Sequence, residues 1–242
     1  MAHATPSRVA QVDVWLADLE PAEVVVERYL TILTVDERAR AGRFHFPRDA
    51  RRWIVARGTL RAILGDRLRI DPRDVRFIHG EYGKPELAEA FAGSGLRFNL
   101  SHSGGLALCA VVRHCRVGVD IERLRPVPDL ETIAERTFSP REREALRQLP
   151  PELRHEAFFN CWTRKEAYIK AIGRGLAHPL DRFSVSLAPG APPRLETVDD
   201  DPREAEAWSV EAFVPSAGYA AALVVEGRAD RIVRDTWPGG VR

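Results

Sequence analysis

Lysine is scarce in this chain. Only three of its 36 Lys and Arg residues are lysines, namely Lys84, Lys165 and Lys170. A compact ammonium serves as a point charge against phosphate or a reacting oxygen, where a planar guanidinium fits less well. Lys165 and Lys170 also lie close together beside Glu166. We therefore expect the three lysines to have specific roles, the alternative being chance in an arginine-rich composition.

Other absences exclude whole classes of protein. No uncharged apolar run approaches the ~20 residues that span a bilayer, and the first residues lack the basic-then-apolar order of a signal peptide. We expect a cytoplasmic protein without a membrane partner. The three cysteines, Cys109, Cys115 and Cys161, are an odd set without metal-ligand spacing, which argues against disulfides and zinc. A net charge of +1 offers no general field for nucleic acid, so no nucleic-acid partner is expected.

The order of sequence patterns repeats along the chain. The helix-like "RRWIVARGTLRAIL" precedes the strand-like "DVRFIHGEYGKPEL" and "LRFNLSHSGGLALCAVV", and "AFFNCWTRKEAYIKAIGRGL" precedes "RFSVSLAPGAPPRL" and "WSVEAFVPSAGYAAALVV". This predicts an α+β fold of two similar halves, 1–118 and 119–242, joined near the extended, proline-containing "ERLRPVPDLE". Ser139 before Pro140 predicts a helix start, and Gly173 a helix end. Residues 189–206 read as a loop.

The stretch "VGVDIER", 117–123, holds two acids in a strand-like run. Side chains alternate along a strand, so Asp120 and Glu122 share one face while Val119 and Ile121 share the other. Two neighbouring carboxylates repel each other unless a cation lies between them. A hard divalent metal would resolve this repulsion, the alternative being an exposed edge whose acids pair with nearby arginines.

A third acid lies in "WTRKEAYIKAIGRGL", where Glu166 and Lys170 form an i,i+4 pair on a predicted helix. Such a pair alone is more often a solvated salt bridge. A glutamate on a helix that faces the acidic strand would complete the oxygen ligands that Mg²⁺ prefers. Lysines nearby would then neutralise a phosphate.

The turn in "FNLSHSGG", 98–105, offers Ser101, His102 and two glycines after a short strand. Hydroxyl, imidazole and backbone N–H groups in such a turn can hold phosphate. A nucleophile elbow would need glycine two residues before the serine, and Asn99 stands there instead. A serine hydrolase is therefore excluded at this motif.

Together these stretches resemble a known family. "EYGKP", "FNLSHSGG", "VGVDIE" and "WTRKEAYIKAIGRGL" follow the order and approximate spacing of the 4′-phosphopantetheinyl transferases of the surfactin-synthetase-activating class. The resemblance spans roughly residues 37–187 and implies that family's pseudo-dimeric α+β fold. It also implies a monomer, because both halves of the site lie in one chain.

The resemblance implies roles for individual residues. Mg²⁺, or Mn²⁺ in its place, would be held by Asp120, Glu122 and Glu166, with Glu166 also the base and Lys170 the catalytic lysine at the pyrophosphate. The residues implied to bind coenzyme A (CoA) are Arg40, Arg52, Lys84, Ser101, His102, Lys165 and Lys170. Among these, Arg40, Arg52 and His102 are expected at the 3′-phosphate.

The implied reaction moves 4′-phosphopantetheine from CoA to a serine of an apo-acyl or peptidyl carrier protein and releases adenosine 3′,5′-bisphosphate. Two alternatives are a Mg²⁺-dependent nuclease and a non-catalytic CoA-binding module. A nuclease usually carries its acid and lysine two apart on a strand, whereas Lys165 and Glu166 are adjacent on a predicted helix. A module without catalysis has no need of all three acids.

Overall fold

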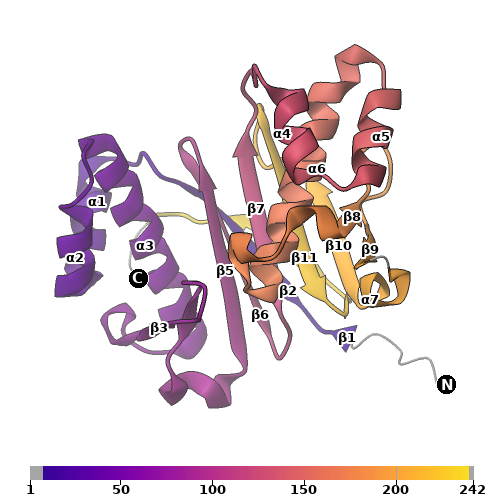
Figure 1. Ribbon diagram of the computed structural model, residues 1–242. Coiled ribbons are helices and arrows are strands. Elements are labelled where there is room, and N and C mark those ends of the chain that lie inside the picture. Colours follow the sequence, from indigo (N-terminus) through magenta and orange to yellow (C-terminus); the bar gives the residue numbers. More distant parts are fainter. Residues whose placement is uncertain (1–7, 200, 240–242) are drawn as a thin grey trace.

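The two sheets of this protein pack face to face, and each carries its helices on its outer side (Figure 1). The structure is a computed structural model that describes residues 8–199 and 201–239. The first sheet has the strand order β13-β2-β6-β5, and the second has the order β10-β11-β7. The predicted α+β class is therefore confirmed, as layers of helices, sheet, sheet and helices.

The longer helices and strands follow the order expected from the sequence. Several short strands and helices, such as β1 and α7, were not expected. The first half contains β1 (Arg8–Val9), β2 (Val12–Asp18), α1 (Glu23–Ile32), α2 (Val35–Ala41), α3 (Pro47–Leu68), β3 (Phe77–His79), β4 (Pro85–Leu87), β5 (Leu96–Ser103) and β6 (Leu106–Arg113). The second contains β7 (Val117–Arg123), α4 (Leu130–Thr137), α5 (Pro140–Gln148), α6 (Pro151–Ile172), β8 (Phe183–Val185), β9 (Leu195–Val198), α7 (Pro202–Glu206), β10 (Trp208–Phe213), β11 (Tyr219–Glu226), β12 (Arg228–Ala229) and β13 (Ile232–Thr236).

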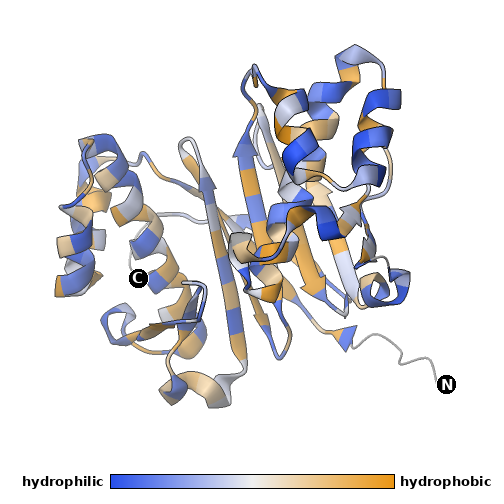
Figure 2. Cartoon of the chain, in the orientation of Figure 1, coloured by the Kyte–Doolittle hydropathy of each residue, from blue (hydrophilic) through white to orange (hydrophobic). Residues whose placement is uncertain are grey.

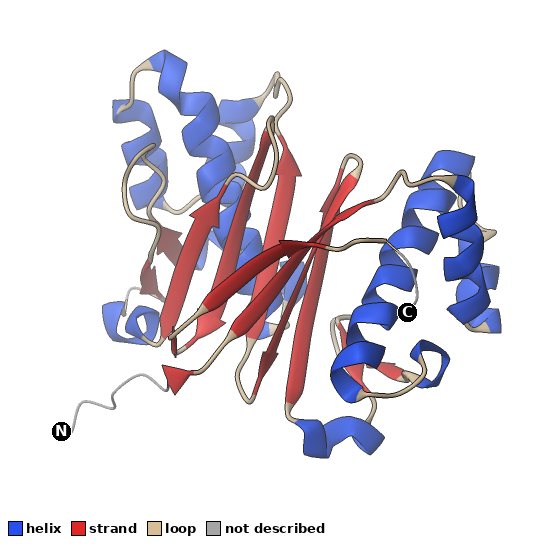
Figure 3. Ribbon diagram, turned by 180° about the vertical axis from the view of Figure 1, so that it is seen from behind, coloured by secondary structure: helices blue, strands red, loops and turns tan. Residues whose placement is uncertain are grey.

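An apolar layer joins the two sheets. Val14 and Leu108 of the first sheet and Val119 and Leu223 of the second all lie in it, and each is at most 2% exposed. Apolar side chains also fill the space between each sheet and its helices, so strands carry apolar residues on both faces. Figure 2 shows these apolar strands between helices whose outer turns are hydrophilic, and Figure 3 shows the strands side by side from behind.

The duplication extends to buried side chains. Helices α2 and α5 each begin with a capping box that contains a glutamate, Glu37 in the first and Glu142 in the second. Each glutamate pairs with a cation on the long helix of its own half: Arg61 Nε lies 2.7 Å from Glu37, and Lys165 Nζ lies 2.7 Å from Glu142. The two ion pairs occupy equivalent places, so they anchor the short helix to the long one in both halves.

Two predictions about the boundaries need correction. β7 already begins at Val117, and β13 leaves the second half to pair with β2 in the first sheet. A division into 1–118 and 119–242 therefore misassigns the last strand, because parallel pairing between distant segments leaves no local pattern. Residues 189–206 are also more than a loop, since β9 and α7 lie there. None of the helices in the described ranges is long and apolar enough to cross a membrane.

Candidate active site

The acids of β7 lie on one face of the strand, as predicted. Val119 and Ile121 are fully buried between the two sheets, whereas Asp120 and Glu122 point to the side of the sheet that α6 covers. Asp120 is only 2% exposed and forms an ion pair with Lys170. The alternative of an exposed strand edge paired with arginines is therefore wrong.

Gly118 brings α6 into contact with this strand. A Cβ atom at Gly118 would stand 2.0 Å from the carbonyl oxygen of Ala167 and 2.4 Å from the backbone nitrogen of Ala171. Only glycine permits such an approach, which brings the last turns of α6 against β7. Glu166 and Lys170 lie on those turns. The close packing thus explains how a helix and a strand 40 to 50 residues apart in sequence share one site.

Asp120 is the centre of the polar cluster. Its Oδ1 atom accepts hydrogen bonds from Ser101 Oγ at 2.8 Å and Lys170 Nζ at 2.5 Å, and Lys170 also donates to Ser101 at 2.9 Å. Its Oδ2 atom is buried and has no hydrogen-bond partner among the residues that the structure describes. Burial raises the pKa of Asp120, and the charge of Lys170 only partly offsets that effect.

Strand β5 supplies a row of polar side chains that face β7. Ser101 contacts Asp120, Ser103 Oγ donates to Glu122 Oε2 at 2.7 Å, and Asn99 Oδ1 accepts the N–H of Val119 at 2.9 Å. β5 and β7 belong to different sheets, so these side chains join the sheets where no backbone ladder does. The sequence analysis gave Asn99 and Ser103 no role in the site, although their two-residue spacing from Ser101 places all three on one face.

Glu166 completes the acidic group. In the ranges 8–199 and 201–239, no hydrogen bond or ion pair involves its carboxylate. Burial raises the pKa of Glu166, and the charges of Asp120 and Glu122 raise it further against the opposing effect of Lys170. A surface salt bridge between Glu166 and Lys170, the alternative for this i,i+4 pair, is absent, because Lys170 binds Asp120 instead.

The three acids are ligands of the type that suits a divalent cation, but their side chains are not arranged around a metal position. Carboxylate oxygens are hard donors, and three of them suit Mg²⁺. The Oδ2 atom of Asp120 is buried without a partner among the described residues, and burying such an atom costs free energy unless a partner binds it. Among the described residues, however, no three His, Cys, Asp or Glu side chains are already arranged to hold a metal ion. In this structure the ammonium of Lys170 provides the positive charge at Asp120.

A cavity of about 350 Å³ in the first half contains two of the residues expected at a phosphate. Arg40 and His102 both line it, together with Trp53 and Arg57. The guanidinium of Arg40 lies over the Trp53 ring at 5.6 Å, and Arg57 Nε is held by Glu37 at 2.5 Å. The cavity therefore combines fixed cations with an aromatic wall. Arg57 was missed, because nothing in its helical pattern distinguishes it from the other arginines.

Two residues expected at CoA do not line this cavity. Arg52 Nη2 pairs with Glu20 at 2.5 Å, although Arg52 is close enough to His102 for its charge to help lower the pKa of that imidazole. Lys84 does not reach the cavity either, because its ammonium donates to backbone carbonyls of the second half, including that of Lys170 at 2.5 Å. Its neighbours Gly83 and Pro85 line the cavity in its place.

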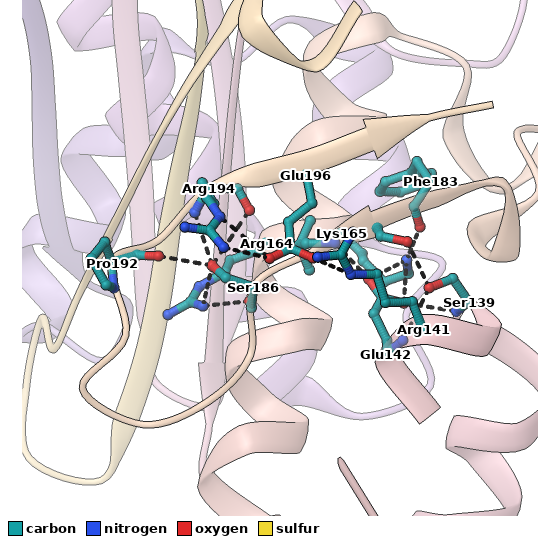
Figure 4. A network of polar contacts seen from close by, with 12 residues as sticks. Ser139, Arg141, Glu142, Arg164, Lys165, Phe183, Ser186, Pro192, Arg194 and Glu196 are labelled. Carbon is teal, nitrogen blue, oxygen red and sulfur yellow. Dashed lines mark hydrogen bonds and ion pairs between the residues drawn. The ribbon is translucent and has the colours of Figure 1, made fainter. Parts of the chain in front are cut away.

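Lys165 is the clearest correction. Its side chain is 1% exposed and lies inside the second half, where Nζ donates to Glu142 at 2.7 Å and to the Phe183 carbonyl at 2.6 Å (Figure 4). A helix turns about 100° per residue, so Lys165 and Lys170 point about 140° apart. Lys165 therefore cannot help Lys170 at a phosphate, and its partner Glu142 explains why a buried lysine is tolerated.

Comparison with known proteins identifies the family. Residues 17–114 match the model described as "4′-phosphopantetheinyl transferase, N-terminal", and residues 116–224 match that of the 4′-phosphopantetheinyl transferase superfamily. The chain is 45% identical over 217 residues to the 4′-phosphopantetheinyl transferase HetI of Nostoc sp., covering 90% of this chain and 88% of that protein. The chain belongs to the 4′-phosphopantetheinyl transferases.

One further curated relative and one solved structure are also similar to this chain. The 4′-phosphopantetheinyl transferase Sfp of Bacillus subtilis is 35% identical over 161 residues, covering 66% of this chain and 69% of that protein. Among solved structures, a holo-(acyl-carrier-protein) synthase from Bacillus anthracis in complex with CoA (3′,5′-ADP) covers 46% of this chain and 95% of its own, at 24% identity and a TM-score of 0.37.

The family assignment confirms the reaction class predicted from the motifs. The protein is an enzyme, a 4′-phosphopantetheinyl transferase of the Sfp-like class. The alternatives of a nuclease and of a CoA-binding module without catalysis are therefore not supported. The roles of the individual site residues stay predictions.

Proposed function

We propose that the protein transfers 4′-phosphopantetheine at the cluster of Asp120, Glu122 and Glu166, in a Mg²⁺-dependent reaction. The supporting observation is the Oδ2 atom of Asp120, which is buried beside two further carboxylates and has no hydrogen-bond partner in the described part of the chain. Mg²⁺, or Mn²⁺ in its place, would supply a Lewis acid that offsets the charge of the pyrophosphate. Asp120, Glu122 and Glu166 are the residues that would hold it.

Glu166 is proposed to accept the proton of the carrier-protein serine. Its carboxylate has no hydrogen-bond partner in the described part of the chain, so it is free to bind an incoming hydroxyl. A base in this position contributes about 10²–10⁴ in rate. The remaining acceleration in phosphoryl transfer comes from positioning and charge stabilisation.

Lys170 is proposed to stabilise charge on the leaving phosphate. Its ammonium already lies in the cluster, on Asp120 and Ser101, and its side chain is 27% exposed, so a bound phosphate can reach it. A fixed cation at the place where negative charge develops lowers the barrier without reorganisation. Ser101 helps to hold that cation in position.

The nucleotide end of CoA is assigned to the cavity of the first half. Arg40, Arg57 and His102 would bind the 3′-phosphate, and Trp53 offers an aromatic surface for the base. Arg57 takes the place expected for Arg52. The acidic cluster and this cavity come from one chain, which favours a monomer, and the free thiols of all three cysteines fit the reducing cytoplasm.

Intact-mass measurement of apo-carrier proteins tests this function. Carriers incubated with the enzyme, CoA and Mg²⁺ should gain the mass of one phosphopantetheine arm, and a chelator should abolish the gain. Glu166→Gln should lower kcat by at least about 10² with almost no change in melting temperature. Glu152→Gln, an exposed acid on the first turn of the same helix, is the matched control and should behave as wild type.

Two results would contradict the assignment. Undiminished transfer in the presence of chelator would remove the metal from the reaction. More than half of wild-type kcat in Glu166→Gln would show that Glu166 is not the base, even if transfer itself is observed.

A further inference from the structure

Lys84 reaches from the first half of the molecule into the second. It lies at the end of the turn between β3 and β4, and its side chain leaves that hairpin toward α6 and β7. Its ammonium donates to the Lys170 carbonyl at 2.5 Å and to the carbonyls of Val117 and Ala171 at 3.4 Å each. Three donors thus meet three acceptors from two elements of the other half.

Two of the carbonyls that Lys84 binds lie at the end of a helix. α6 ends at Ile172, so the carbonyls of Lys170 and Ala171 have no helical N–H four residues further on. The C-terminal end of a helix also carries partial negative charge, which a cation stabilises. Burial lowers the pKa of Lys84 to about 8, so the ammonium is still largely charged at neutral pH.

The two elements joined by this ammonium carry the catalytic groups. α6 carries Glu166 and Lys170, and β7 carries Asp120, three residues after Val117. One of the three carbonyls belongs to Lys170 itself. A shift of the last helical turn would therefore move the Lys170 ammonium away from Asp120.

We propose that Lys84 is a positioning residue that holds the end of α6 against β7, so that Glu166 and Lys170 face Asp120. This role rests on the proposed function, because it concerns the alignment of those groups. This role differs from the contact with CoA that the resemblance implies for Lys84. A direct contact with CoA would require the ammonium to leave all three carbonyls.

Kinetics separate the two roles. Lys84→Met removes the charge and the donors at similar length, and it should lower kcat by about tenfold or more, since displacements near 1 Å can cost up to about 10²-fold. The KM for CoA should stay within about threefold, as expected when only the transition state loses stabilisation. Lys84→Arg keeps the cation and should lie between Lys84→Met and wild type in kcat.

The control variant is Arg97→Gln. Arg97 is exposed, lines the same small cavity as Lys84 and makes no bond to α6. It should keep wild-type kcat and KM. Hydrogen exchange without CoA adds a readout independent of turnover: the amides of the last turn of α6, up to Gly173, should exchange faster in Lys84→Met and not in Arg97→Gln.

Distinct results would overturn the inference. A raised KM for CoA with kcat unchanged, in Lys84→Met or in Lys84→Arg, would show direct binding of the donor. Wild-type kinetics in Lys84→Met, or unchanged exchange at the end of α6, would show that no positioning role exists. Because Lys84→Arg retains the cation, it carries the test if Lys84→Met does not fold. If wild-type enzyme transfers nothing from CoA, the proposed function fails instead.

Discussion

Gly118→Ala is the change that most directly tests how the site is assembled. The added methyl group would stand 2.0 Å from the Ala167 carbonyl oxygen, and ordinary contact begins near 3.4 Å. The helix must therefore retreat from β7 by about 1.4 Å at this point. Both neighbouring atoms belong to backbone, so no side chain can rotate to make room.

The displacement has two consequences of predictable size. Forcing one extra carbon into packed structure destabilises a protein by about 1–3 kcal/mol. Moving Glu166 and Lys170 by more than about 1 Å from Asp120 should also lower kcat by about 10²-fold. The KM for CoA should change much less, because the cavity with Arg40 and His102 lies in the first half.

The assay combines urea unfolding with steady-state transfer to one apo-carrier protein, followed by intact mass. Gly93→Ala is the matched control, since a Cβ atom at Gly93 meets nothing within 4 Å. It should match wild type in the free energy of unfolding and in kcat. Wild-type kcat together with unchanged stability in Gly118→Ala would refute the claim that α6 and β7 touch through this glycine.

Three more expectations concern the surroundings of the site. Arg57→Gln should raise the KM for CoA by about 10- to 100-fold, because a charge-assisted hydrogen bond contributes roughly 1.5–3 kcal/mol, but it should hardly change the KM for dephospho-CoA. Arg52→Gln should have an equally small effect on the KM for both donors. A rise in the KM for CoA alone in Arg52→Gln, with no such rise in Arg57→Gln, would contradict the cavity assignment. Lys165→Met should lower the free energy of unfolding by about 3–5 kcal/mol, because Glu142 is left buried without its cation. The double variant Lys165→Met with Glu142→Leu should recover much of this loss. A changed KM for CoA at unchanged stability in Lys165→Met would instead place Lys165 at the substrate. Burial raises the pKa of Glu37, but the hydrogen bonds from Arg61, the Thr34 backbone and Arg57, together with the charge of Arg57, lower it more. The contribution of Glu37 to stability is therefore present at neutral pH and is lost as the pH falls through the lowered pKa. The stability difference between wild type and Glu37→Gln, measured by urea unfolding, should shrink below about pH 4, and a pH-independent difference would speak against this ion pair.

Local patterns in the sequence were sufficient for much of the fold and for the centre of the site. The alternation in "VGVDIER" placed Asp120 and Glu122 on the face of β7 opposite Val119 and Ile121, because successive side chains of a strand point to opposite faces. The helix start at Ser139 before α5 and the helix end at Gly173 after α6 are likewise set by local residues, and both were predicted correctly. The repeat of these patterns predicted the two α+β halves.

Tertiary contacts of individual side chains were not predictable in the same way. Lys84 and Lys165 share a residue type with Lys170, and Lys165 also shares its motif, yet Lys84 binds the end of α6 and Lys165 a buried glutamate. Arg52 and Arg57 differ only in which turn of α3 carries them, and only Arg57 lines the cavity. Composition cannot separate such residues, because the direction of a side chain depends on which surface its helix packs against.

The sequence by itself determined which residue types stand on which face of each element, since backbone periodicity acts over a few residues. Tertiary structure alone decided which of those faces meet. The approach of α6 to Gly118, the row of Asn99, Ser101 and Ser103 against β7, and the return of β13 to β2 all join segments far apart in the chain. Their physical basis is the packing of two sheets around a shared apolar layer, which no local pattern specifies.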